Sequence, residues 1–207
     1  MTERKKRISA SLARTLVTYT TNKSPDWSQK IKSYLDNKFP GNKDTAYGVR
    51  METFARKCYE RITDYTVTEA GLCINPKIPW LCCSLDGLVI GSHTIEIKCP
   101  SVGKSKKASE MLKDLTYIDA KDINDVKLLK TNNYYCQVQL GMFISNLKNC
   151  HFILYSSEND SCFFFSVPFD EQRVVNGYLP KLQYVYFSHM LKYLSSEHDK
   201  CHSEENG

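Results

Sequence analysis

The stretch Asp86-Gly87-Leu88-Val89-Ile90-Gly91-Ser92-His93-Thr94-Ile95-Glu96-Ile97-Lys98-Cys99-Pro100 sets three charged side chains among apolar and β-branched residues. Glu96 and Lys98 lie two residues apart on a segment typical of a β-strand, so their side chains project from the same face. The alternate residues Ile95 and Ile97 are expected to be buried. Two carboxylates and one ammonium at the end of a sheet are the parts of a metal-dependent phosphodiesterase site.

The turn inside this stretch decides whether Asp86 shares that face. With a two-residue loop at 91–92, Asp86 would lie opposite Ile97 and its side chain would point to the other face. With a three-residue loop at 91–93, or an equivalent bulge, Asp86 falls opposite Lys98, where both carboxylates can share a cation. The sequence therefore predicts a three-residue or bulged turn.

Two glycines suit this turn. Gly91 supplies the positive φ that such loops need, and Gly87 is expected to leave open space beside Asp86. The alternative is a surface hairpin whose Glu96 and Lys98 are only solvated or paired, because short Glu-x-Lys strings are common.

Composition sets the frame for the whole chain. With 207 residues, 42% hydrophobic and 25% charged, we expect a single domain over 1–195 and a disordered tail over 196–207. The formal net charge of +5 suits an anionic partner without requiring one. No apolar run reaches the roughly 18 residues of a membrane span. The nine cysteines lack zinc-ligand spacing, so we expect reduced thiols in a soluble, intracellular protein.

Hydrophobic periodicity outlines the order of elements. Helices are expected over 8–18, 27–37, 45–63, 131–146 (capped by Thr131) and 171–194 (interrupted or started at Pro180). Short strands are expected as a meander through 67, 72–74, 80–83, 88–90 and 94–97, followed by a hairpin of 150–155 and 162–167. Residues 104–130 form either a helix with a mobile, DNA-facing loop or only a loop. These elements predict an α/β (α+β) domain with one mixed β-sheet flanked by helices.

Five segments carry a further pattern, in one order along the chain. They read RKKRISAS (4–11) against R-x-G-R-I-T-A-S, YGVRME (47–52) against W-G-x-x-x-E, PWLCCSLDGL (79–88) against P-W-L-x-A-S-P-D-G-L, IEIKCP (95–100) against V-E-I-K-C-P, and YYCQVQ (134–139) against Y-x-x-Q-V-Q. In these motifs the sequence resembles the YqaJ-like viral recombinase family, the phage lambda exonuclease group of PD-(D/E)XK nucleases. The resemblance implies a restriction-endonuclease-like core.

Two positions depart from the family pattern. Lys6 stands where a Gly is usual, which puts in doubt how tightly the first turn folds around a terminal phosphate. Leu85 stands where a Pro is usual, and we expect it to loosen the approach to Asp86.

The resemblance also implies a metal site. Asp86 and Glu96 would bind Mg²⁺ directly, the backbone carbonyl of Ile97 would be a further ligand, and Glu52 would contact the metal through water. Two ions are expected, and Mn²⁺ is expected to substitute. The alternative for Glu52 is a surface pair with Arg56, four residues along the same helix.

Further residues receive roles by the same resemblance. Lys98 would orient or deprotonate the attacking water, or offset charge on phosphorus, and Gln137 would complete the catalytic set. Arg4, Ser11 and Arg7 would bind a DNA 5′-phosphate, with Tyr134 also contacting DNA. The alternatives are a frayed basic terminus for Arg4 and an ordinary buried polar role for Tyr134. The lysines of 104–107 either touch DNA phosphates or lie in a solvated loop.

The resemblance implies a Mg²⁺-dependent deoxyribonuclease, most directly a 5′-to-3′ exonuclease on double-stranded DNA, acting in recombination, repair or DNA end processing. One alternative is an endonuclease or single-strand-specific nuclease, and another is a catalytically inactive DNA-binding module on the same fold. The expected partners are 5′-phosphorylated duplex DNA and a single-strand annealing protein. A homotrimer and a monomer both remain open, and the location would be nuclear or cytoplasmic in a eukaryotic or viral setting.

Overall fold

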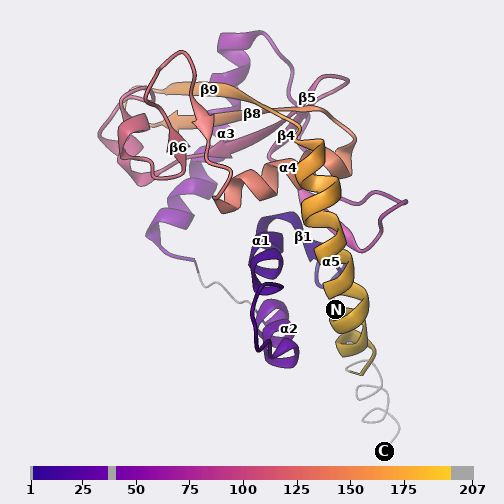
Figure 1. Cartoon of the computed structure of the whole chain (residues 1–207). Helices are drawn as coiled ribbons and strands as arrows, with labels where there is room; N and C mark the ends of the chain where they lie inside the picture. The colour runs from indigo at the N-terminus through magenta and orange to yellow at the C-terminus, as the bar shows by residue number, and fades with distance from the viewer. Residues whose placement is uncertain (1, 37–40, 197–207) are drawn as a thin grey trace, which may run out of the picture.

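The computed structural model describes residues 2–36 and 41–196 (Figure 1). Its helices are α1 (Ala10–Tyr19), α2 (Trp27–Leu35), α3 (Lys43–Thr63), α4 (Asn133–Ser145) and α5 (Leu179–Val185). The strands are β1 (Ile8–Ser9), β2 (Leu72–Cys73), β3 (Leu81–Ser84), β4 (Gly87–Val89), β5 (His93–Lys98), β6 (Ile118–Asp119), β7 (Lys127–Leu128), β8 (Asn149–Ser156) and β9 (Ser161–Pro168). The shorter helical segments are η1 (Ser101–Lys104), η2 (Met111–Asp114), η3 (Gln172–Tyr178) and η4 (Tyr186–Met190).

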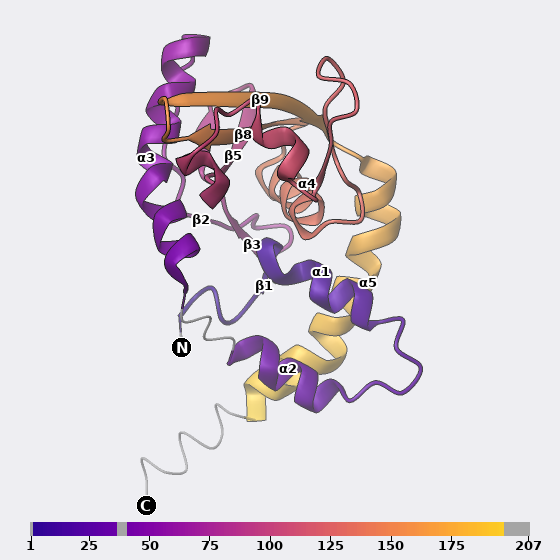
Figure 2. The ribbon, with the colours of Figure 1, turned by 90° about the vertical axis from the view of Figure 1, so that its left-hand side faces the viewer.

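The central sheet is mixed and has the order β4-β5-β8-β9. β5 runs parallel to β8, whereas β4 and β9 are antiparallel to their neighbours. Figure 2 shows α3 on one side of these strands and α4 on the other. Ile95 and Ile97 of β5 pack with Tyr59 of α3, so the alternate residues Glu96 and Lys98 face α4. The fold class predicted from the sequence is confirmed.

A second sheet, of order β1-β3-β2, corrects the expected meander. β3 turns away from β4 and pairs in parallel with β1, which places Ile8 opposite Leu81. These strands close a core formed with α1, α2, α4 and the C-terminal helix. Because α4 lies between this core and the central sheet, it is buried nearly all round.

The β4–β5 turn has three residues, as predicted, but they are 90–92 rather than 91–93. Val89 pairs with His93 and Gly87 with Ile95, and Gly91 has a φ of 74°. Extending this register places Asp86 opposite Glu96 instead of Lys98. The shift is by two positions, so Asp86 keeps the face that the sequence predicts.

The structure also defines the buried face of α3 and the residue that caps α4. On α3, Phe54 and Ile62 are 56% and 51% exposed, and the buried face of the helix centres on Ala55, Cys58 and Tyr59. Asn132, not Thr131, caps α4, because its Oδ1 accepts a hydrogen bond from the Tyr134 N–H at 2.9 Å.

The C-terminal helix passes through Pro180 without a break. The π-helical segment η3 leads into α5, the π-helical segment η4 follows, and helix continues to residue 196. The rest of the expected tail, 197–207, and residue 37 of the second predicted helix lie outside the described residues.

The segment 104–130 is neither a long helix nor a bare loop. It contains η2 and the β6–β7 ribbon, and its apolar residues pack against α4, β8 and β9. The buried members are Ala108, Met111, Leu112, Leu115, Ile118, Val126 and Leu128. Within the described residues, no helix is both long and apolar enough to cross a bilayer.

Gly87, beside Asp86, is closely packed rather than open. A Cβ at this position would lie 2.4 Å from Val67 Cγ1 and 2.9 Å from Ile95 Cδ1. The predicted open space is therefore wrong, and the absent side chain is what lets β4 approach its neighbours.

We predict that Gly87→Ala lowers the free energy of unfolding by about 1–3 kcal/mol, the usual range for overpacking a core. Urea denaturation monitored by far-UV circular dichroism measures this change. Gly71→Ala is the matched control, because no heavy atom lies within 4 Å of its added Cβ. Equal stability of the two variants would contradict the packing described for β4.

Candidate active site

A hollow of about 440 Å³ opens at the end of β5, where α3, η1 and α4 begin. The residues that line it are Asn42, Asp44, Thr45, Gly48, Val49, Glu52, Asp86, Ile97, Lys98, Cys99, Pro100, Ser101, Tyr117 and Tyr134. The sequence motifs at 47–52, 79–88, 95–100 and 134–139 therefore contribute side chains to one place.

Asp86 and Glu96 are held by different contacts. The Ile97 N–H donates a hydrogen bond to Asp86 Oδ2 at 2.7 Å, which fixes the carboxylate beside the last residues of β5. Glu96 is only 3% exposed, and its Oε1 accepts a hydrogen bond from Gln137 Nε2 at 2.7 Å while pairing with the Lys98 ammonium. The structure thus brings together four of the five predicted catalytic residues.

Aromatic rings form one wall around Lys98. Its Nζ lies 4.6 Å from the centre of the Tyr134 ring, a cation–π arrangement that restrains the ammonium. Tyr117 packs edge-on against Tyr134 with ring centres 4.9 Å apart. Tyr134 therefore lies with the carboxylate group, and Tyr117 is a wall residue that sequence patterning gave no reason to select.

Glu52, the fifth predicted catalytic residue, both lines the hollow and forms the pair with Arg56 that was its alternative. It lines the hollow, and its Oε1 accepts a hydrogen bond from Arg56 Nη2 at 3.0 Å. Arg56 is 8% exposed and also donates to the Asp86 carbonyl, from Nε at 3.2 Å and Nη2 at 3.0 Å, while pairing with Glu69. The i+4 spacing predicted the pair with Glu52, but the link to Asp86 spans 30 residues and left no local signal.

The three carboxylates and the lysine perturb one another electrostatically. Burial, and then the nearby Asp86 and Glu52, raise the pKa of Glu96 to about 7 despite the opposing effect of Lys98. Burial and Asp86 likewise raise the pKa of Glu52. Burial disfavours charge on Lys98, but Glu96 and Asp86 outweigh it and raise the pKa of Lys98. The site therefore favours an ammonium at Lys98 and concentrates negative charge around it.

The donor set partly fits a divalent metal. One oxygen each of Asp86, Glu96 and Glu52 makes the contacts given above, and the second oxygen of each accepts no hydrogen bond from the described residues. Carboxylate oxygens are the ligands that Mg²⁺ prefers. However, no group of three or more His, Cys, Asp or Glu side chains in the described ranges is arranged to hold an ion. The chemistry suits a hard cation at Asp86 and Glu96, with Glu52 further out.

The residues predicted to bind a 5′-phosphate each make separate contacts. Arg4 hydrogen-bonds Ser84, two residues before Asp86, and Ser11 Oγ lies 3.0 Å from Ser9 Oγ. Arg7 instead donates to the Pro79 carbonyl at 2.8 Å and pairs with Glu3 at 2.6 Å.

Glu3 also pairs with Lys6 at 2.7 Å, so it neutralises part of the basic segment. The sequence could have predicted these two ion pairs, because Lys6 and Arg7 lie three and four residues after Glu3. Of the lysines after β5, Lys106 pairs with Asp114 at 2.7 Å and Lys104 lies 4.4 Å above the Tyr47 ring.

Leu85 does not loosen the approach to Asp86 as expected. It is 7% exposed, and its Cδ2 would lie 3.0 Å from a Cβ added at Gly141 of α4. Close packing of the Leu85 side chain against α4 therefore fixes this position, as the ring of a Pro would do in the family pattern.

We predict that Arg56→Met lowers the free energy of unfolding by about 2–3 kcal/mol, because it leaves a buried carbonyl and a carboxylate without their donor. Equilibrium chemical denaturation measures the loss. Arg61→Met is the matched control on the same helix, since Arg61 pairs with Asp160 between side chains that are 57% and 55% exposed. That control is expected to cost much less, because both of its charges are exposed to solvent, and an equal loss in both variants would contradict the bridging position of Arg56.

Solved structures share this fold across nearly the whole chain. An alkaline exonuclease (LHK-Exo) from Laribacter hongkongensis is 21% identical with a TM-score of 0.65, covering 99% of this chain and 96% of its own. The same protein in complex with dAMP is 20% identical with a TM-score of 0.64, covering 99% and 97%. A phage-related exonuclease from Haemophilus somnus 129PT is 13% identical with a TM-score of 0.64, covering 92% and 96%.

No curated protein matches the sequence closely enough to count as a relative. The model of the YqaJ-like viral recombinase domain matches residues 1–148, which hold all five motifs and every residue assigned to the site. The chain belongs to the YqaJ-like viral recombinase domain family.

Proposed function

We propose that the chain is a divalent-metal-dependent deoxyribonuclease, most specifically a 5′-to-3′ exonuclease on double-stranded DNA. The observation that carries this proposal is Glu96, a carboxylate 3% exposed that is held by Lys98 and Gln137 beside Asp86. Burying such a charge is costly unless it is paired, so its presence next to Lys98 and Asp86, which line the hollow, favours a chemical role. A structural ion pair alone would not require the neighbouring carboxylates of Asp86 and Glu52.

These contacts support the following roles. Asp86 and Glu96 would hold Mg²⁺ or Mn²⁺, with the Ile97 carbonyl as a further ligand, and a bound ion would polarise the phosphate and favour hydroxide. Gln137 would fix the orientation of the Glu96 carboxylate. Lys98, restrained over the Tyr134 ring, would place its ammonium where negative charge develops on the phosphate oxygens.

Glu52 would complete the acidic face of the site through water, in an orientation that Arg56 fixes. A cation between these carboxylates would lower the pKa of Glu96 and the pKa of Lys98, both of which are raised in its absence. The ionised carboxylate and the metal would therefore stabilise each other.

A 5′-phosphate end is the proposed point of attachment. Arg4 beside Ser84, together with Ser11 at the start of α1, offers a guanidinium fork and hydroxyl groups near the strand that leads to Asp86. Arg7 would act by holding the N-terminal segment to the Pro79 carbonyl. The complex of the Laribacter exonuclease with dAMP supports a deoxynucleoside monophosphate as the product class.

A cleavage assay tests the proposal directly. Linear and covalently closed circular duplexes are incubated with the whole chain in Mg²⁺ or in EDTA. We expect degradation of 5′-phosphorylated linear DNA in Mg²⁺ only, and a loss of about 10²–10³-fold in rate for Asp86→Asn and for Lys98→Met. Lys57→Met, an exposed residue of α3 outside the hollow, is the control and should keep the rate.

Each other outcome has a clear meaning. Cleavage of closed circles would replace the exonuclease by an endonuclease, and preference for single strands would replace the duplex substrate. Binding of DNA without metal-dependent cleavage of any substrate would reduce the chain to a DNA-binding module.

A further inference from the structure

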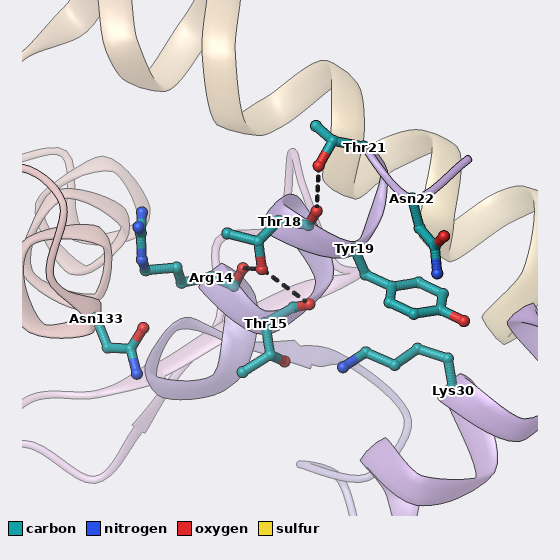
Figure 3. Close-up of a pocket in the computed structure, with 8 residues that line it drawn as sticks. All are labelled: Arg14, Thr15, Thr18, Tyr19, Thr21, Asn22, Lys30 and Asn133. Carbon is teal, nitrogen blue, oxygen red and sulfur yellow. Dashed lines mark hydrogen bonds between the residues drawn. The ribbon is translucent and has the colours of Figure 1, made fainter. Parts of the chain in front are cut away.

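A second hollow, of about 450 Å³, lies on the outer side of α1 and shares no residue with the active-site hollow (Figure 3). We call it the α1 hollow. Its lining comprises Arg14, Thr15, Thr18, Tyr19, Thr21, Asn22, Lys30 and Asn133. Residues of α1, of the loop that follows it, of α2 and of the start of α4 therefore meet at one surface.

The α1 hollow is positively charged without a counter-charge. Its lining contains Arg14 and Lys30 but no Asp or Glu. Neither cation forms an ion pair within the part of the chain that the structure describes, and Lys30 Nζ lies 5.1 Å from the centre of the Tyr19 ring. By contrast, nine other Lys and Arg side chains are paired with carboxylates: Lys6, Arg7, Arg56, Arg61, Lys98, Lys106, Lys127, Lys130 and Arg173.

The remaining neutral donors of the hollow are the side-chain amides of Asn22 and Asn133, because its three threonine hydroxyls already donate to backbone carbonyls. Thr18 Oγ1 donates to the Arg14 carbonyl at 3.0 Å and Thr21 Oγ1 to the Thr18 carbonyl at 2.8 Å, so these hydroxyl protons stay within the helix (Figure 3). Asn22 Oδ1 accepts a hydrogen bond from the Ser24 N–H at 3.0 Å, which leaves the amide NH₂ of Asn22 to donate. Two cations and amide donors without a carboxylate match an anion that accepts several hydrogen bonds.

The first turn of α4 connects the two hollows. Asn133 lines the α1 hollow, whereas its neighbour Tyr134 lines the active-site hollow against Lys98. A polyanion that occupies the active-site hollow can therefore continue over the start of α4 onto α1. Successive phosphates along one DNA molecule supply charge at both places.

We propose that the α1 hollow binds a backbone phosphate of the duplex DNA whose end occupies the active site, with Arg14 and Lys30 as its cationic contacts. This inference rests on the proposed function and adds a second anchoring point to it. The contact holds the duplex without reading its sequence, because phosphate contacts position DNA and carry no base information.

The salt dependence of DNA binding tests the proposal. Binding of a fluorescent, 5′-phosphorylated 30-base-pair duplex to the whole chain is measured by anisotropy in EDTA over 50–200 mM NaCl. The double variant Arg14→Gln/Lys30→Gln should bind more weakly and lower the magnitude of the slope of log K against log[salt] by about 1, because one lost phosphate contact removes about 0.9. The swap Arg14→Lys/Lys30→Arg preserves both charges and should restore the slope.

Lys57→Gln/Lys192→Gln is the matched control, since both lysines are exposed, line neither hollow and carry the same total charge. If the α1-hollow variant and this control have equal slopes, the proposal is wrong. Melting temperatures of all variants establish that the fold is retained. Failure of the proposed nuclease would instead appear as wild-type protein that binds DNA but never cleaves it, an outcome these slopes do not depend on.

Discussion

The hydrogen bond from the Ile97 N–H to the Asp86 carboxylate closes the β4–β5 hairpin at the end where its ladder stops. It exists because the turn at 90–92 has three residues and keeps Asp86 on the face of Glu96 and Lys98. Because β5 is held by its pairing with β8, a slip of one residue would turn Asp86 away from Glu96 and Lys98 and toward the apolar cluster that holds Ile95 and Ile97. Turn length therefore determines whether the charged residues form a site or destabilise a core.

The helix α4 makes the buried charge tolerable. It is enclosed by the central sheet on one side and by the α1–β3 core on the other, so its position is determined by packing on both faces. From this position Gln137 reaches Glu96, and the ring of Tyr134 lies beside Lys98. The pKa of Glu96, raised to about 7, shows that burial still outweighs these contacts. A hard cation would stabilise the ionised carboxylate further, which links the electrostatics of the site to its proposed chemistry.

Local patterns predicted most of what is local. The spacing of Glu96 and Lys98 predicted their shared face. The requirement that Asp86 lie on that same face predicted a turn of three residues. Contacts between residues distant in sequence could not be predicted from local patterns. The parallel pairing of β1 with β3 involves only two residues of each strand, and the hydrogen bonds from the Arg56 guanidinium to the Asp86 carbonyl span 30 residues. Within 104–130 the apolar residues 108, 111, 112 and 115 have helical spacing, but they form only the short helix η2, and their packing against β8 and β9 is a contact distant in sequence. The family resemblance supplied the roles, and the structure supplied the contacts that make them physically reasonable.

Anomalous diffraction from crystals of the whole chain soaked in Mn²⁺ tests the central claim most directly, because it locates the ion without relying on activity. The account predicts a peak within about 2.0–2.4 Å of carboxylate oxygens of both Asp86 and Glu96, and none at this position in Asp86→Asn crystals. A peak bound only by other residues, or an empty site at saturating Mn²⁺, would contradict the assignment of these two carboxylates as the metal site.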